Sequence, residues 1–164
     1  PNPGDIDEEA EVHMALLQDI VVAVRDIRRE MRVPPAARVT VMVRAEDERE
    51  EFLKREREFV ERFARAERVK VGRMARPPLS AVAVVQGMEV FVPLGDLIDV
   101  DAERRRLERE LASLKKRLET SRQKLEDEKF LNRAPSEVVE REREKFRELS
   151  GQIGRLKRNL EALS

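Results

Sequence analysis

Apolar residues recur every three or four positions through the first part of the chain, with arginines between them. The recurring residues are Leu16, Ile20, Val24, Ile27 and Met31. This spacing predicts an amphipathic helix from about Asp7 to Arg32, whose apolar stripe must be covered by a partner. Val33-Pro34-Pro35 ends the helix, because proline has no amide donor and restricts the residue before it.

Shorter patterns follow this helix. Alternating valines from Val39 to Val43 predict a strand, and Val69-Lys70-Val71 predicts a second one. Between them, a charged segment with phenylalanines on one side predicts a helix from about Glu46 to Glu67.

Two further apolar runs are separated by a turn signal. Ala81–Val85 and Val90–Val92 flank Gln86-Gly87, which predicts a β-hairpin because glycine accepts a positive φ. Residues 37–98 are therefore expected to form a small α+β unit.

The last third carries two apolar repeats with alternating steps of three and four residues. The first repeat is Leu107, Leu111, Leu114, Leu118, Ser121 and Leu125, and the second is Phe146, Leu149, Ile153, Leu156, Leu160 and Leu163. Each is the a/d seam of a coiled coil. Asn132-Arg133-Ala134-Pro135 lies between them, and Pro135 suits the first turn of a new helix.

Folding the chain back at this turn brings the two seams into one register. Residues that face each other in an antiparallel pair have numbers with a constant sum, which is 267 here and has its midpoint between Arg133 and Ala134. Near the tip, Phe130, Leu131 and Val138 are expected to take over the packing. The facing pairs are Leu107–Leu160, Leu111–Leu156, Leu114–Ile153, Leu118–Leu149 and Ser121–Phe146. The predicted fold class is α+β: an N-terminal helix, a small α/β unit, and a long antiparallel two-helix coiled-coil hairpin.

Composition narrows the function classes. The 164 residues include 34 basic and 34 acidic side chains, no cysteine and one histidine, His13. Thiol chemistry, cysteine-bound zinc and histidine metal clusters are therefore not expected, and His13 is more simply a helix-surface or partly packed residue. No apolar run approaches the roughly 20 residues of a membrane span. We expect a cytoplasmic chain with no membrane contact, no catalytic residue, no metal and no cofactor site.

Charge is unevenly distributed along the chain. Residues 1–100 hold 16 basic and 20 acidic side chains, whereas residues 101–164 hold 18 and 14. In the predicted hairpin, five cations fall at e positions and share one edge with a single acid, Glu108. These five residues, which we call the cationic edge, are Lys115, Arg122, Lys129, Arg143 and Lys157. An edge of one sign repels itself unless a partner is present, and heptad steps of about 10.5 Å suit a polyanion. The alternative is a solvated surface with no partner.

Gly151 and Gly154 lie outside the seam, at f and b positions of the second helix. Each costs about 1 kcal/mol relative to alanine inside a helix. Two explanations stay open: close approach of another backbone, or local looseness of the helix.

Specific runs of sequence resemble one family. Val92–Glu103 (VPLGDLIDVDAE) and Arg106–Leu111 (RLEREL) resemble the entry to the C-terminal arm of valyl-tRNA synthetases. Leu16–Pro35, which contains Ile27-Arg28-Arg29-Glu30, is similar to the final anticodon-domain helix of these class I enzymes. One departure is Glu126-Asp127, where the family commonly has a small residue and Asn. The segments similar to the arm tip and return helix are Lys124-Leu125, Phe130, Ala134-Pro135, Val138-Val139-Glu140 and Glu142-Arg143-Glu144-Lys145.

The resemblance implies the C-terminal portion of a valine–tRNA ligase. Residues 1–36 would be the last helix of an anticodon-binding bundle, 37–98 a connecting unit, and 99–164 a coiled-coil arm. The arm would contact the outer corner of valine-specific tRNA through its backbone, and the chain would also meet the upstream domains of the same enzyme. The family's HIGH and KMSKS signatures are absent from this sequence. ATP-dependent attachment of valine would therefore belong to an upstream catalytic domain.

A protein from a different class also fits the hairpin pattern. A scaffold or chaperone-like arm that grips protein would show the same seams without any link to RNA. The cationic edge favours RNA, because a protein-gripping arm has no need for it.

Overall fold

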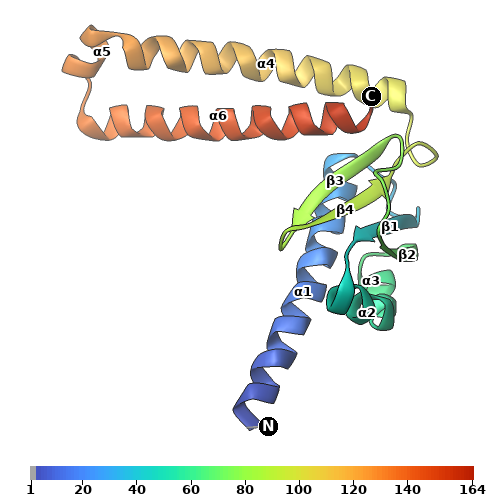
Figure 1. Cartoon of the computed structure of the whole chain (residues 1–164). Coiled ribbons are helices and arrows are strands. Elements are labelled where there is room, and N and C mark those ends of the chain that lie inside the picture. Colours follow the sequence, from blue (N-terminus) through green and yellow to red (C-terminus); the bar gives the residue numbers. More distant parts are fainter. Residues whose placement is uncertain (1–2) are drawn as a thin grey trace. The chain divides into compact units, whose positions relative to one another are not determined.

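The computed structural model describes residues 3–164, with side chains from residue 8 onward. The chain forms two compact units, residues 1–100 and 101–164. Among the described residues, no helix is long and apolar enough to cross a membrane. The first unit contains α1 (Pro3–Glu30), β1 (Val39–Arg44), α2 (Asp47–Arg55), α3 (Arg57–Phe63), β2 (Ala66–Gly72), β3 (Ser80–Val85) and β4 (Met88–Pro93) (Figure 1).

The predicted N-terminal helix is confirmed as α1, which begins at Pro3, four residues before the expected start at Asp7. Its apolar stripe is buried: Ile20 and Val24 are fully enclosed. After Glu30 the chain turns through Arg32, which has a φ of 52°. The amide of Val33 then donates to the carbonyl of Arg28 at 2.9 Å, a closure typical of a helix C-terminus. This turn sends residues 34–37, which we call the proline segment, back along the end of α1.

The first unit is built on a four-stranded sheet with the order β2-β1-β4-β3. β1 pairs in parallel with β2 and antiparallel with β4. Val39, Val41 and Val43 are buried, as their alternation predicts. The β3–β4 hairpin is confirmed, with Gln86 and Gly87 at φ 48° and 81° in its turn.

The predicted helix from Glu46 to Glu67 is wrong in two respects. It is two helices, α2 and α3, separated at Glu56, whose φ and ψ are −102° and 14°. The helical segment also ends at Phe63, and Ala66 and Glu67 belong to β2. Parallel pairing with β1 determines this end, because Ala66 takes the place opposite Val39 in the sheet. Tertiary pairing therefore overrides the helical propensity of this segment.

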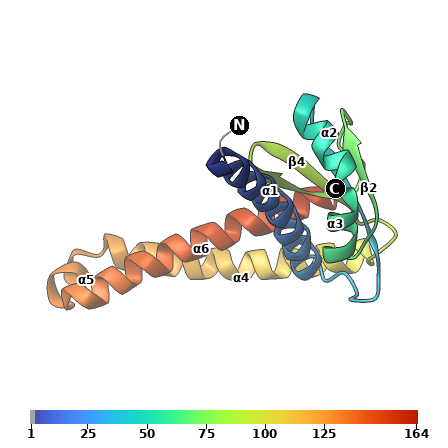
Figure 2. The same ribbon diagram turned by 90° about the horizontal axis from the view of Figure 1, so that it is seen from below.

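The second unit contains α4 (Val100–Glu126), α5 (Glu128–Arg133) and α6 (Ser136–Ala162). α4 and α6 lie side by side and antiparallel in both views (Figures 1 and 2). Leu107 and Leu114 are buried on α4, and Leu149, Ile153 and Leu156 on α6, in the predicted seam positions. The side chain of Arg104 donates to the carbonyl of Leu163, a pair with the same sum of 267. The predicted coiled-coil hairpin is confirmed.

The tip differs from the continuous helix that the heptads suggest. α4 ends at Glu126, and Asp127 caps a separate short helix, its carboxylate accepting from the amide of Lys129 at 3.0 Å. The expectation that Val138 completes the packing is wrong: Val138 is 39% exposed, whereas Val139 is only 7% exposed. Val139 stands seven residues before Phe146, so the heptad of α6 continues into its first turn and places Val139 on the seam side.

Candidate nucleic-acid interface

All five residues of the cationic edge lie on the surface of the second unit. Lys115 and Arg122 are on α4, and Arg143 and Lys157 are on α6. Lys129 lies on α5, beyond the interruption at Asp127, so its e position does not continue the heptads of α4. Lys115, Arg122 and Lys157 each follow a buried d residue, and Arg143 follows the half-buried Glu142, so their side chains lie at the border of the seam.

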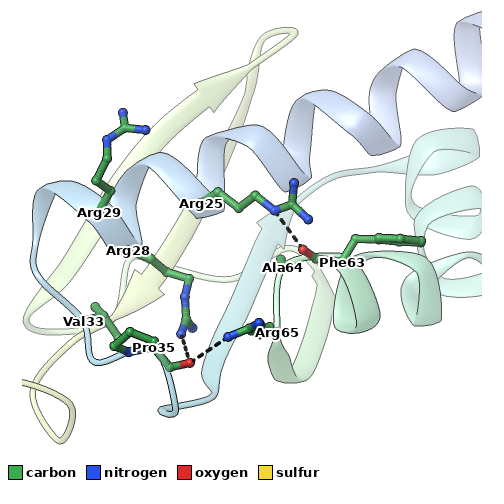
Figure 3. Close-up of a pocket in the computed structure, with 8 residues that line it drawn as sticks. All are labelled: Arg25, Arg28, Arg29, Val33, Pro35, Phe63, Ala64 and Arg65. Atoms are coloured by element: carbon green, nitrogen blue, oxygen red, sulfur yellow. Dashed lines mark hydrogen bonds between the residues drawn. The ribbon is translucent and has the colours of Figure 1, made fainter.

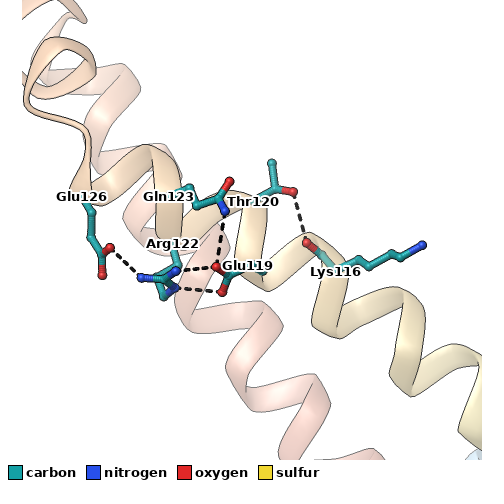
Figure 4. Close-up of polar contacts among 6 residues, drawn as sticks. All are labelled: Lys116, Glu119, Thr120, Arg122, Gln123 and Glu126. Carbon is teal, nitrogen blue, oxygen red and sulfur yellow. Dashed lines mark hydrogen bonds and ion pairs between the residues drawn. The ribbon is translucent and has the colours of Figure 1, made fainter.

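Arg122 is held by two carboxylates of its own helix (Figure 4). Its Nε donates to Glu119 at 2.8 Å, and its Nη1 donates to Glu126 at 2.6 Å. A further Nη2 bond to Glu119 completes a two-pronged ion pair. Hydrogen bonding to Glu119 raises the pKa of Arg122 further above its ordinary value, and hydrogen bonding to Arg122 lowers the pKa of Glu119. The charge of Arg122 is therefore locally neutralised.

Arg143 is paired more loosely. Its Nη1 lies 3.6 Å from Glu140, which also contacts Arg147 at 3.4 Å. In the register of the hairpin, Arg122 and Arg143 fall at nearly the same height on one edge. The carboxylates beside each guanidinium reduce the repulsion between them.

The lysines of the edge differ from its arginines. Within the described part of the chain, Lys115, Lys129 and Lys157 have no carboxylate within ion-pair distance, whereas Arg122 and Arg143 do. Sequence reasoning missed these partners, although Glu119, Arg122 and Glu126 stand at i, i+3 and i+7, a spacing that indicates ion pairs on a helix. The lysines are thus the more available cations of the edge.

The single histidine has a packing role. The ring of His13 stacks on the ring of Phe52, with centroids 4.3 Å apart and planes inclined by 24°. Among the described residues, no group of three or more His, Cys, Asp or Glu side chains is arranged to hold a metal ion.

Comparisons with known proteins show which sequences this chain is similar to. A family model described as the valyl tRNA synthetase tRNA binding arm matches residues 99–164. The chain is 38% identical over 141 residues to the valine–tRNA ligase of Enterococcus faecalis, covering 85% of this chain and 16% of that protein. It is 39% identical over 163 residues to the valine–tRNA ligase of Nitratidesulfovibrio vulgaris, covering 98% and 18%. The corresponding protein of Agrobacterium fabrum is 37% identical over 165 residues, covering 100% and 17%.

The matches cover most of this chain but only a small part of each relative. The chain spans less than a fifth of the length of each of these ligases. The family model falls on the helical hairpin, which is the second compact unit and the part that carries the cationic edge. Through residues 99–164, the chain belongs to the valyl-tRNA synthetase tRNA-binding arm family.

Proposed function

We propose that this chain is the C-terminal, tRNA-binding portion of a valine–tRNA ligase, and that its cationic edge lies along tRNA phosphates at the outer corner of the molecule. The observation that carries the proposal is the charge of this edge. Lys115 and Lys157 are exposed there without a carboxylate partner among the described residues. The family model on the same hairpin supports tRNA as the polyanion.

The edge acts through charge and position. Lysine is a compact cation on a flexible stem and binds phosphate without a fixed geometry, so it adds affinity but reads no base. Arg122 and Arg143 join the contact by replacing their ion pair with a glutamate by an ion pair with a phosphate. Helices of 27 residues each are about 40 Å long, so the edge can follow several nucleotides.

Chemistry belongs to the rest of the enzyme in this proposal. Activation of valine with ATP and its transfer to tRNA take place in upstream domains, and α1 is the last helix of their anticodon-binding bundle. The arm then contributes to the binding and orientation of the valine-specific tRNA.

The test compares two double variants of equal charge. Lys115→Gln with Lys157→Gln removes two edge cations, and Lys116→Gln with Arg158→Gln removes two exposed cations at f positions, on the outer faces of the helices away from the seam. Binding of tRNA is measured at several salt concentrations. The edge variant should bind more weakly and show a log–log salt slope shallower by up to about two units, because each phosphate contact releases counterions. Equal losses in both variants would contradict a defined edge.

A further inference from the structure

A second group of cations lies in the first unit, around a pocket of about 410 Å³ between the end of α1, the proline segment and the end of α3. Four arginines line it: Arg25, Arg28 and Arg29 from α1, and Arg65 from the turn before β2 (Figure 3). None of the described residues that line it is acidic. We call these four residues the arginine pocket.

Arg28 is anchored by neutral acceptors. Its Nη2 donates to the carbonyl oxygens of Pro34 at 3.3 Å, Pro35 at 3.3 Å and Ala37 at 2.6 Å. Its Nη1 is buried and has no hydrogen-bond partner in the described chain. Burial, and then the charge of Arg65, lower the pKa of Arg28. The backbone thus holds this guanidinium in place without neutralising it.

Arg25 and Arg65 are held in the same way. The Nε of Arg25 donates to the carbonyl of Phe63 at 3.0 Å, and the Nη1 of Arg65 donates to the carbonyl of Pro35 at 3.2 Å. Arg28 and Arg65 therefore share the Pro35 carbonyl (Figure 3). Of the four arginines, Arg29 has a carboxylate partner in the described structure, Asp26 at 3.1 Å.

This arrangement concentrates positive charge that the pocket does not offset. Three guanidinium groups are fixed by carbonyls that carry no net charge, so bringing them together costs electrostatic free energy unless an anion joins them. Arginine presents several donors in a planar fork that matches the oxygens of a phosphate. Arg25, Arg28 and Arg29 also stand at i, i+3 and i+4, which places them together on one side of α1.

We propose that the arginine pocket binds a backbone phosphate of RNA, as a contact separate from the cationic edge. RNA as the source of the phosphate rests on the proposed function, whereas binding of a phosphate group rests on the pocket alone. An acidic polypeptide offers carboxylates, and it is distinguished from RNA in the test below.

The first measurement follows the arginine Nε–H signals of the whole 164-residue chain by NMR. Inorganic phosphate should shift the signals of Arg25, Arg28 and Arg65 saturably, and chloride at equal ionic strength should not. A tRNA should shift them at far lower concentration. No response to phosphate would overturn the proposal, and so would equal potency of polyglutamate and tRNA.

The second measurement uses matched variants and tRNA binding. Arg25→Gln with Arg65→Gln removes two pocket cations but keeps Arg28, whose bonds hold the proline segment. Arg38→Gln with Arg68→Gln removes two exposed arginines of the same unit that line no part of this pocket. The pocket variant should lose about tenfold in affinity, and the control should lose much less. Equal losses would overturn the proposal.

The two proposals fail in different ways. If the edge variant binds tRNA normally while phosphate still shifts the pocket signals, the proposed function of the hairpin edge is wrong and the phosphate site remains. If phosphate leaves the pocket signals unchanged while the edge variant loses tRNA affinity, the pocket is wrong and the edge remains.

Discussion

The cations of the hairpin edge and those of the arginine pocket are held by opposite means. On the edge, Arg122 is fixed by two glutamates of its own helix, which cancel its charge. In the pocket, Arg28 is fixed by three backbone carbonyls, which leave its charge intact. An anion must displace a carboxylate to reach Arg122, whereas the partners of Arg28 are neutral carbonyls that do not compete with an anion for its charge. The number of arginines on a surface is therefore a poor guide to its affinity for phosphate; their existing partners matter more.

The apolar seam, rather than the charged residues around it, should provide most of the stability of the hairpin. Leu114 is 6% exposed and faces Ile153 in the register. Leu114→Ala should lower the free energy of unfolding by about 2–4 kcal/mol, because it leaves a cavity. Lys116→Ala, an exposed control, should change it by less than about 0.5 kcal/mol. Urea denaturation followed by circular dichroism measures both, and comparable losses would contradict the seam.

The pocket arginine should matter for folding where the edge arginine does not. Arg28→Ala removes three charge-assisted hydrogen bonds to the proline segment, and we expect a loss of about 2 kcal/mol in the free energy of unfolding. Arg122→Ala removes exposed ion pairs and should have little effect. If the two variants were equally stable, the carbonyl anchoring of Arg28 would not be structural.

How much of this difference the sequence predicts depends on the range of the interactions. The hairpin register follows from local heptads, and the β3–β4 turn follows from Gln86-Gly87. The end of α3 is not readable locally, because Ala66 is drawn into β2 by pairing with Val39. The short helix at the tip depends on the cap at Asp127, and the spacing of apolar residues does not reveal such a cap.

The same distinction applies to the two candidate sites. The glutamate partners of Arg122 are visible as helix neighbours three residues before it and four residues after it. The arginine pocket is not visible in this way, since Arg65 lies 30 residues from Pro35, whose carbonyl it shares with Arg28. Only the tertiary fold brings these groups together.

The glycines of α6 sharpen the assignment of faces on the hairpin. A Cβ built on Gly151 meets no atom within 4 Å, so no part of the described chain approaches it closely. Gly151→Ala should therefore stabilise the hairpin by up to about 1 kcal/mol, through its higher helix propensity. Because position 151 lies at f, away from the cationic edge, tRNA affinity should stay the same. A large loss of affinity would show that RNA contacts the face around Gly151 and would contradict binding at the cationic edge.

Neutralisation of Arg122 can be tested by removing one of its two carboxylate partners. Glu119→Gln should leave Arg122 freer to meet phosphate and raise tRNA affinity about two- to fivefold. The pKa of Glu119 is lowered by its bond to Arg122, so the ion pair is fully present above the ordinary value of 4.5 and is lost as the pH falls through the lowered value. Weaker tRNA binding by Glu119→Gln would show that the ion pair positions Arg122 rather than masking it.

The central claim is that the hairpin edge holds tRNA for an enzyme whose chemistry takes place elsewhere. The most direct test introduces Lys115→Gln and Lys157→Gln into the complete ligase, with Lys116→Gln and Arg158→Gln as the control. We predict a higher KM for tRNA in aminoacylation by the edge variant, with the rate of valine-dependent ATP–pyrophosphate exchange unchanged. An unchanged KM for tRNA, or a loss of exchange activity in the edge variant, would contradict the account.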